Sequence, residues 1–257
     1  MSVSLMYFAG LMLSLPLLPI LLIQAKRVKQ TVPRLPEAHQ NVRGSVGTGQ
    51  RTIRLVTLGE STVAGVGVSD HTDGITGHIA QTISRLTGSK VTWEVIGKSG
   101  YTARKAAERL VTKLPDATVD SIVIGLGAND SFAFNSPTTW QRDIEQLITS
   151  IRCKYEDCPI VFANMPPVGQ FPAFPWIMRV ILGSLTTLYG LVLGQLVRKH
   201  AKLYYVDRPI KFKDWAERAG SEVSIDDLFS DGVHPSAQTY ALWGEEVGEF
   251  MGKKKIV

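Results

Sequence analysis

Residues 53–62 read Ile-Arg-Leu-Val-Thr-Leu-Gly-Glu-Ser-Thr, a short β-rich run that stops at a glycine and is followed closely by a serine. Apolar and β-branched residues in a run of this length predict a strand over residues 53–58, and Gly59 predicts the turn that ends it. A serine just past such a turn can point its hydroxyl into the crevice at the sheet edge. Most serines in this position only cap a helix or a turn, so Ser61 becomes a candidate nucleophile only if other reactive groups meet it.

The same alternation of strand and helix continues along the chain. Four further apolar runs predict strands, over residues 91–96, 121–126, 160–164 and 203–206. Helical spacing of apolar residues predicts helices over residues 75–87, 102–113, 138–155 and 236–251, with a long apolar helical stretch that ends near residue 200. This alternation predicts an α/β fold with a five-stranded parallel sheet covered on both faces. In such sheets the functional site lies beyond the carboxyl ends of the strands.

Glycines and polar side chains follow three of the predicted strands. Gly100 lies after the second strand, Asn129 after the third, and the stretch Asp231-Gly232-Val233-His234-Pro235 after the fifth. Taken singly, these are ordinary signs of a helix-capping turn, an Asn-Asp turn and a structural histidine. Together with Ser61 they supply a nucleophile, a backbone donor, an amide donor, an orienting acid and a base at one sheet edge. Acyl transfer needs this set of groups.

These four blocks, in this order, resemble those of the SGNH hydrolase superfamily, also called GDSL-like lipases and esterases. The matching stretches are Gly59-Glu60-Ser61 (with Glu where the family motif has Asp), Gly100, Gly127-Ala128-Asn129-Asp130 and Asp231-Gly232-Val233-His234. The resemblance covers residues 59–235, nearly the whole predicted domain. It implies a three-layer α/β/α flavodoxin-like sandwich.

The resemblance also implies roles for five residues. Ser61 would attack a carboxylic ester, His234 would take its proton, and Asp231 would orient the imidazole. The backbone N–H groups of Ser61 and Gly100 and the side-chain amide of Asn129 would form the oxyanion hole. The expected protein is a serine esterase or lipase that needs no metal and no organic cofactor.

The N-terminal segment is apolar. No charged residue occurs from Val3 to Ile23, a length that can cross a bilayer. We expect residues 1–25 to be a retained membrane anchor, because no Lys or Arg precedes the apolar run as it would in a signal peptide. A signal-like helix, uncleaved or cleaved, is the alternative. Residues 26–50 are predicted to be a basic flexible linker, and residues 51–257 the hydrolase domain. The basic residues that follow the run favour the cytoplasmic side of the membrane for this domain, with a periplasmic or secreted location as the alternative.

The formal charge of +5 is concentrated at the chain termini. Residues 1–54 carry seven Lys and Arg against one Glu, and Lys253, Lys254 and Lys255 lie near the C-terminus. The span between them is mildly acidic, which argues against nucleic acid as a partner and favours a membrane-proximal tail.

The two cysteines, Cys153 and Cys158, are expected to be free thiols rather than a disulfide.

A second apolar stretch, residues 171–197, precedes the last predicted strand. Its plainest interpretation is a buried helix with the loop that leads into it. The functional interpretation is an acyl pocket or lid, with Phe171, Phe174, Trp176 and Ile177 as substrate contacts. Such a pocket favours an acyl or lipid-like ester, while a carbohydrate O-deacetylase, an acyltransferase and a non-catalytic membrane-tethered binding domain are the alternatives.

Overall fold

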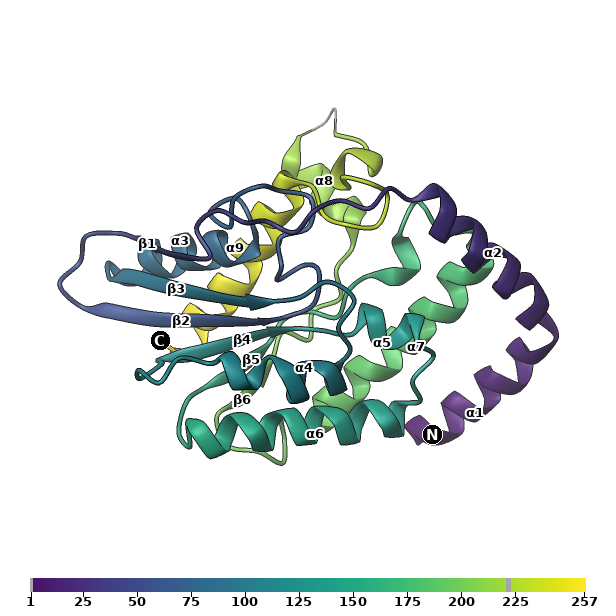
Figure 1. Ribbon diagram of the computed structural model, residues 1–257, viewed down its shortest axis with the longest axis horizontal. Helices are drawn as coiled ribbons and strands as arrows, with labels where there is room; N and C mark the ends of the chain where they lie inside the picture. The colour runs from purple at the N-terminus through teal and green to yellow at the C-terminus, as the bar shows by residue number, and fades with distance from the viewer. Residues whose placement is uncertain (1, 221–222) are drawn as a thin grey trace.

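Five parallel strands form the centre of the molecule in the computed structural model, which describes residues 2–220 and 223–257 (Figure 1). They are β2 (Thr52–Gly59), β3 (Lys90–Gly97), β4 (Ser121–Gly125), β5 (Ile160–Phe162) and β6 (Leu203–Tyr205). Each pairs in parallel with its neighbour, in the order β3-β2-β4-β5-β6. The predicted α/β fold and its five parallel strands are confirmed.

A sixth strand extends one edge of the sheet. β1 (Arg43–Val46) pairs antiparallel with β3, so the full order is β1-β3-β2-β4-β5-β6. The backbone N–H of Ala38 also donates to Ala64 O, and the Trp93 indole donates to Asn41 O. Residues 26–50 are therefore not the flexible linker that was expected. Only one face of β1 is partly buried, so its sequence needs no run of apolar residues to form an edge strand.

Helices cover both faces of the sheet. On one face lie α3 (Ile75–Thr87) and α9 (Ala237–Lys253), and on the other α4 (Ala103–Arg109), α6 (Pro137–Lys154) and much of α7 (Trp176–Leu196). Ile79, Ile83 and Val247 belong to the first apolar core, and Ala106, Ile144 and Tyr189 to the second. Each helix presents apolar residues at helical spacing to the sheet, which accounts for the three layers.

Several short elements complete the domain. The helix expected over residues 102–113 is α4 followed by a 3-10 turn, Val111–Lys113. Two helices were not predicted: α5 (Ala128–Phe132), which begins three residues after β4, and α8 (Phe212–Ala219). α5 has five residues and α8 has eight, which leaves little room for a helical repeat in the sequence.

The N-terminal segment forms two helices outside the three layers. α1 (Val3–Ser14) and α2 (Leu18–Thr31) are joined by a 3-10 turn at Leu15–Leu17. In Figure 1 they form a bent segment at the side of the domain, and each of the two helices contacts α7. Pro16 and Pro19 fall at this bend. By length and composition, Val3–Thr31 and Trp176–Leu196 could each cross a membrane, but half of the latter is buried within the domain. The N-terminal apolar helix is a signal sequence or a membrane anchor.

Three glycines stand side by side where the central strands end. Gly59 is in register with Gly97 on β3 and with Gly125 on β4. A Cβ atom on Gly59 would lie 2.0 Å from the carbonyl oxygen of Gly125. The backbones can approach this closely only without side chains, so the loops that follow these strands begin from one tightly packed edge.

Candidate active site

The four sequence blocks meet at one cavity. Ser61, Gly100, Asn129 and His234 all line it, and its volume is about 620 Å³. Ser61 lies in the turn directly after β2, partly buried, and His234 comes from the loop that leads into α9. The structure therefore brings together side chains that are up to 173 residues apart in the sequence.

Asp231 holds His234 through a short loop. The Asp231 Oδ2 atom lies 2.7 Å from His234 Nδ1, while Oδ1 accepts the backbone N–H groups of Val233 at 2.9 Å and His234 at 2.7 Å. Burial opposes ionisation of Asp231, but the hydrogen bonds from His234 and Val233 outweigh it and lower the pKa of the carboxyl. A carboxylate on Nδ1 fixes the ring orientation and leaves Nε2 as the nitrogen available to a substrate or nucleophile.

Two backbone N–H groups are available at the cavity. Gly100 has φ +79°, and a Cβ atom there would meet nothing within 4 Å, so this turn is open to the cavity. Within residues 2–220 and 223–257, neither the N–H of Ser61 nor that of Gly100 donates to a protein acceptor. Free donors of this kind are what a developing oxyanion requires.

Asn129 is held by Glu60, a residue whose role the sequence did not reveal. The buried Glu60 carboxyl group accepts the backbone N–H of Ala128 and of Asn129, both at 2.9 Å, and an N–H of the Asn129 side-chain amide at 2.6 Å. The second hydrogen of Nδ2 faces Tyr101 O at 3.2 Å. Burial raises the pKa of Glu60 to about 8, against the opposing effect of its hydrogen bonds. Glu60 thus caps α5 and sets the direction of the Asn129 amide.

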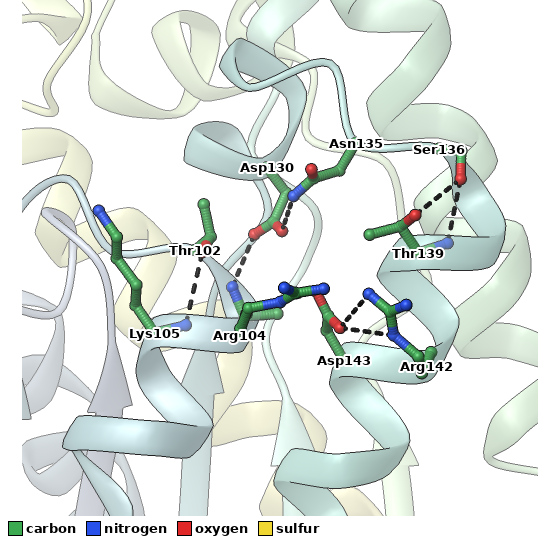
Figure 2. Close-up of polar contacts among 10 residues, drawn as sticks. Thr102, Arg104, Lys105, Asp130, Asn135, Ser136, Thr139, Arg142 and Asp143 are labelled. Atoms are coloured by element: carbon green, nitrogen blue, oxygen red, sulfur yellow. Dashed lines mark hydrogen bonds and ion pairs between the residues drawn. The ribbon is translucent and has the colours of Figure 1, made fainter.

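Asp130 ties the Gly100 turn to the same helix. Its Oδ2 accepts the backbone N–H of Ala103 at 2.9 Å, at the start of α4, and its Oδ1 accepts the Asn135 amide at 2.8 Å (Figure 2). Asp130 is buried, and burial raises its pKa to about 6. Gly100 and Asn129 therefore sit on two segments joined through one carboxyl group.

Apolar side chains form most of the remaining cavity wall. Phe171 and Phe174 line it as expected, and so do Met178 and Leu182 of α7. Trp176 and Ile177 do not: Trp176 is 65% exposed on the outside of α7, and Ile177 is buried in the apolar core. The expectation for these two residues is corrected, because α7 begins at Trp176 and its helical turn directs Met178 and Leu182 to the cavity instead.

Other lining residues come from segments that the sequence patterns did not connect with the site. They are Phe132, Phe134, Phe212, Phe229 and Trp243, together with part of the N-terminal segment. Nothing in the spacing of single aromatic residues indicates a common cavity. Among the described residues, no group of three or more His, Cys, Asp or Glu side chains could hold a metal ion.

The comparison with known proteins agrees with this geometry. The model of the GDSL-like lipase/acylhydrolase family matches residues 57–242, so the chain belongs to this family of carboxylic ester hydrolases. The match runs from the end of β2 to the first turns of α9 and includes every block of the candidate site. No curated protein matches the chain in sequence.

Solved structures share the fold at low sequence identity. A crystal structure of TesA is 19% identical with a TM-score of 0.58, over 79% of this chain and 99% of that chain. The lipase/acylhydrolase from Enterococcus faecalis is 19% identical with a TM-score of 0.55, over 79% and 96%. The Clostridium thermocellum family 3 carbohydrate esterase is 14% identical with a TM-score of 0.56, over 80% and 100%. Similarity at this level establishes the common fold and leaves the substrate open.

Proposed function

We propose that the protein is a serine esterase that hydrolyses carboxylic esters with an apolar, lipid-like acyl group through an acyl-enzyme on Ser61. The observation that carries the proposal is the Asp231–His234 pair. Asp231 Oδ2 lies 2.7 Å from His234 Nδ1, and His234 lines the same cavity as Ser61. A serine hydroxyl and an imidazole that come within hydrogen-bond reach in such a cavity can act as nucleophile and base.

In the proposed mechanism, His234 Nε2 accepts the hydroxyl proton while Ser61 Oγ attacks the ester carbonyl. The bond from Oγ to carbon forms, and the carbonyl electrons move to oxygen. Asp231 stabilises the imidazolium that results. The N–H groups of Ser61 and Gly100 and the amide of Asn129 donate to the oxyanion. When the intermediate collapses, His234 returns the proton to the leaving alcohol, and water then releases the acid by the same steps.

The cavity wall supports an apolar acyl group. Phe171, Phe174, Met178 and Leu182 are apolar side chains that line the same cavity as Ser61 and His234. Burying a methylene against such a wall contributes about 0.8 kcal/mol, whereas a sugar ring would lose hydrogen bonds to water. This wall favours a lipid-like ester over the acetylated sugars that a carbohydrate deacetylase would take.

We also propose that α1 and α2 are a retained membrane anchor and that the domain lies on the cytoplasmic side. The support is the uncharged run from Val3 to Ile23 followed by Lys26, Arg27, Lys29 and Arg34. Basic residues directly after a span are retained on the cytoplasmic side.

The proposal is tested with full-length protein in a neutral detergent. Ser61→Ala and His234→Ala should abolish hydrolysis of p-nitrophenyl esters while circular dichroism shows an unchanged fold. A fluorophosphonate probe should label the wild type and not Ser61→Ala. Ser69→Ala, an exposed serine of the same loop region, is the matched control and should behave as wild type. Full activity in folded Ser61→Ala would disprove the assignment.

A further inference from the structure

The N-terminal segment forms one wall of the candidate active site. Leu21, Ala25 and Val28 of α2 and Val32 and Leu35 just beyond it line the same cavity as Ser61 and His234. Positions 21, 25 and 28 lie on one face of α2, and Val32 follows at the end of this helix. Among the residues that the structure describes, Leu21 is the one buried residue of α1 and α2. The burial of Leu21 places α2 against the catalytic domain. A helix that served only as an anchor would need no such contact.

α7 forms an adjoining part of the wall. Met178 and Leu182 line the same cavity as the N-terminal segment, and α2 contacts α7. The outer side of the N-terminal helices carries exposed apolar residues, with Leu13 79% and Ile23 70% exposed. An apolar slot between α2 and α7 therefore adjoins a surface that is suited to lipid.

The charges of the cavity lining are all basic. Lys29 and Arg34 line the cavity, both are exposed, and neither forms an ion pair within the described part of the chain. Among the residues 2–220 and 223–257, no Asp or Glu belongs to the lining. The nearby Glu37 is occupied by Lys98 at 3.0 Å and by the N–H of Ser99 at 2.7 Å. Two unpaired cations beside an apolar slot match a ligand that has an anionic group next to an acyl chain.

We propose that the substrate is an anionic amphiphile, a lipid ester whose acyl chain lies between α2 and α7 and whose phosphate or carboxylate group binds Lys29 and Arg34. This inference rests on the proposed esterase function and adds the class of substrate. It also gives the N-terminal helix a second role, as part of the substrate-binding site.

The head-group contact is tested with water-soluble lipids, so that general attraction to a charged membrane does not contribute. Full-length protein in a neutral detergent is assayed with monomeric dihexanoyl phosphatidic acid and dihexanoylglycerol. In the double variant Lys29→Gln/Arg34→Gln, the ratio of kcat/KM for the anionic ester to that for the neutral ester should fall about tenfold. Lys26→Gln/Arg27→Gln removes equal charge from positions outside the lining and should leave this ratio unchanged.

An unchanged ratio in Lys29→Gln/Arg34→Gln would overturn the proposal, and so would an equal fall in the Lys26→Gln/Arg27→Gln control. A dicarboxylic acid monoester that replaces the phosphate lipid in the same assay separates a phosphate-specific site from a general anion site. Either anion responding to the Lys29/Arg34 change supports the proposal.

The wall is tested with a bulky side chain. Ala25→Trp places an indole in the slot and should shift the preference among p-nitrophenyl esters from long to short acyl chains. Ile23→Trp adds the same side chain to α2 outside the cavity lining and should leave the chain-length preference as in wild type. An unchanged preference in Ala25→Trp would show that α2 does not bound the acyl site.

Failure of the two levels can be told apart. If Lys29→Gln/Arg34→Gln leaves the anionic-to-neutral ratio of kcat/KM unchanged while the wild type is labelled by the fluorophosphonate and hydrolyses esters, only the substrate class is disproved. Wild-type protein that neither labels nor hydrolyses any ester disproves the esterase function, and the substrate class with it.

Discussion

Glu60 is a buried carboxyl group with three N–H donors on its two oxygens, and burial raises its pKa to about 8. In the unfolded chain a Glu side chain has a pKa near 4.3. Between that pH and about 8, Glu60 therefore holds its proton in the folded state and loses it in the unfolded state. The contribution of Glu60 to stability is therefore complete at low pH and is lost as the pH rises through this window. The slope can reach about 1.4 kcal/mol per pH unit.

This predicts a measurable change in stability with pH. Urea unfolding of the full-length protein from pH 5 to pH 8 should give a free energy of unfolding that decreases with pH, and Glu60→Gln should remove most of that decrease. Glu108→Gln, an exposed Glu on α4, is the matched control. A decrease of the same size in Glu60→Gln would show that another group is responsible.

Asn129 has both amide hydrogens directed at protein acceptors, Glu60 Oε2 at 2.6 Å and Tyr101 O at 3.2 Å. The longer contact is the weaker, so the hydrogen that faces Tyr101 is the one that can turn to an oxyanion. Asn129→Ala should lower kcat for p-nitrophenyl esters about 10²–10³-fold while Ser61 keeps some reaction with the fluorophosphonate probe. A wild-type kcat would remove Asn129 from the oxyanion hole.

The sequence revealed the candidate residues but not their supports. Ser61, Gly100, Asn129, Asp231 and His234 each follow an identifiable strand or lead into an identifiable helix, so their meeting could be predicted from the rule for parallel sheets. The partners of Glu60 lie 68 and 69 residues further along the chain. No local pattern encodes such a contact, and the role of Glu60 became visible only in the folded chain.

At the scale of helices and strands, Asp130 joins α4 to α5. Asp130 accepts the backbone N–H of Ala103, which lies three residues after Gly100. On α5, Asp130 directly follows Asn129 in the sequence. Asp143 on α6 is a buried carboxyl group on the same face of the sheet that plays no part in holding the site. It accepts hydrogen bonds from the side chains of Arg104 and Arg142, and it does not line the cavity (Figure 2).

Asp130→Ala should therefore affect both stability and catalysis. The variant leaves the Ala103 N–H buried without an acceptor, which costs about 1–3 kcal/mol. It also frees the Gly100 turn, so kcat should fall by more than in Asp143→Ala even where the two variants lose similar stability. The measurement is urea unfolding and p-nitrophenyl ester kinetics on both variants. Equal kcat in the two would show that Asp130 serves stability alone.

Helical and strand periodicity predicted the long elements well and the short ones poorly. The strands and helices with apolar residues on a buried face appear within a few residues of their expected bounds. β1 was missed because Arg-Gly-Ser-Val has no apolar alternation, and its pairing with β3 comes from backbone hydrogen bonds. Trp176 was misplaced because spacing alone does not say which side of α7 meets the cavity.

At the scale of the whole molecule, α2 and the catalytic domain line one cavity. If α2 closes the site, the side of the membrane on which the domain lies determines which lipids can reach Ser61. The charge distribution supports the cytoplasmic side, because the basic residues follow the apolar run.

The two cysteines allow this orientation to be tested without new labels. Cys153 is an exposed free thiol, whereas Cys158 is buried and its pKa is raised to about 11 by burial, so only Cys153 should react with a maleimide in the folded protein. A membrane-impermeant maleimide added to intact protoplasts should leave a cytoplasmic domain unlabelled, and lysis should then allow labelling. Cys153→Ser should remove that signal, which identifies the labelled thiol. Labelling of Cys153 before lysis would place the domain, and the cavity behind α2, on the outer side of the membrane.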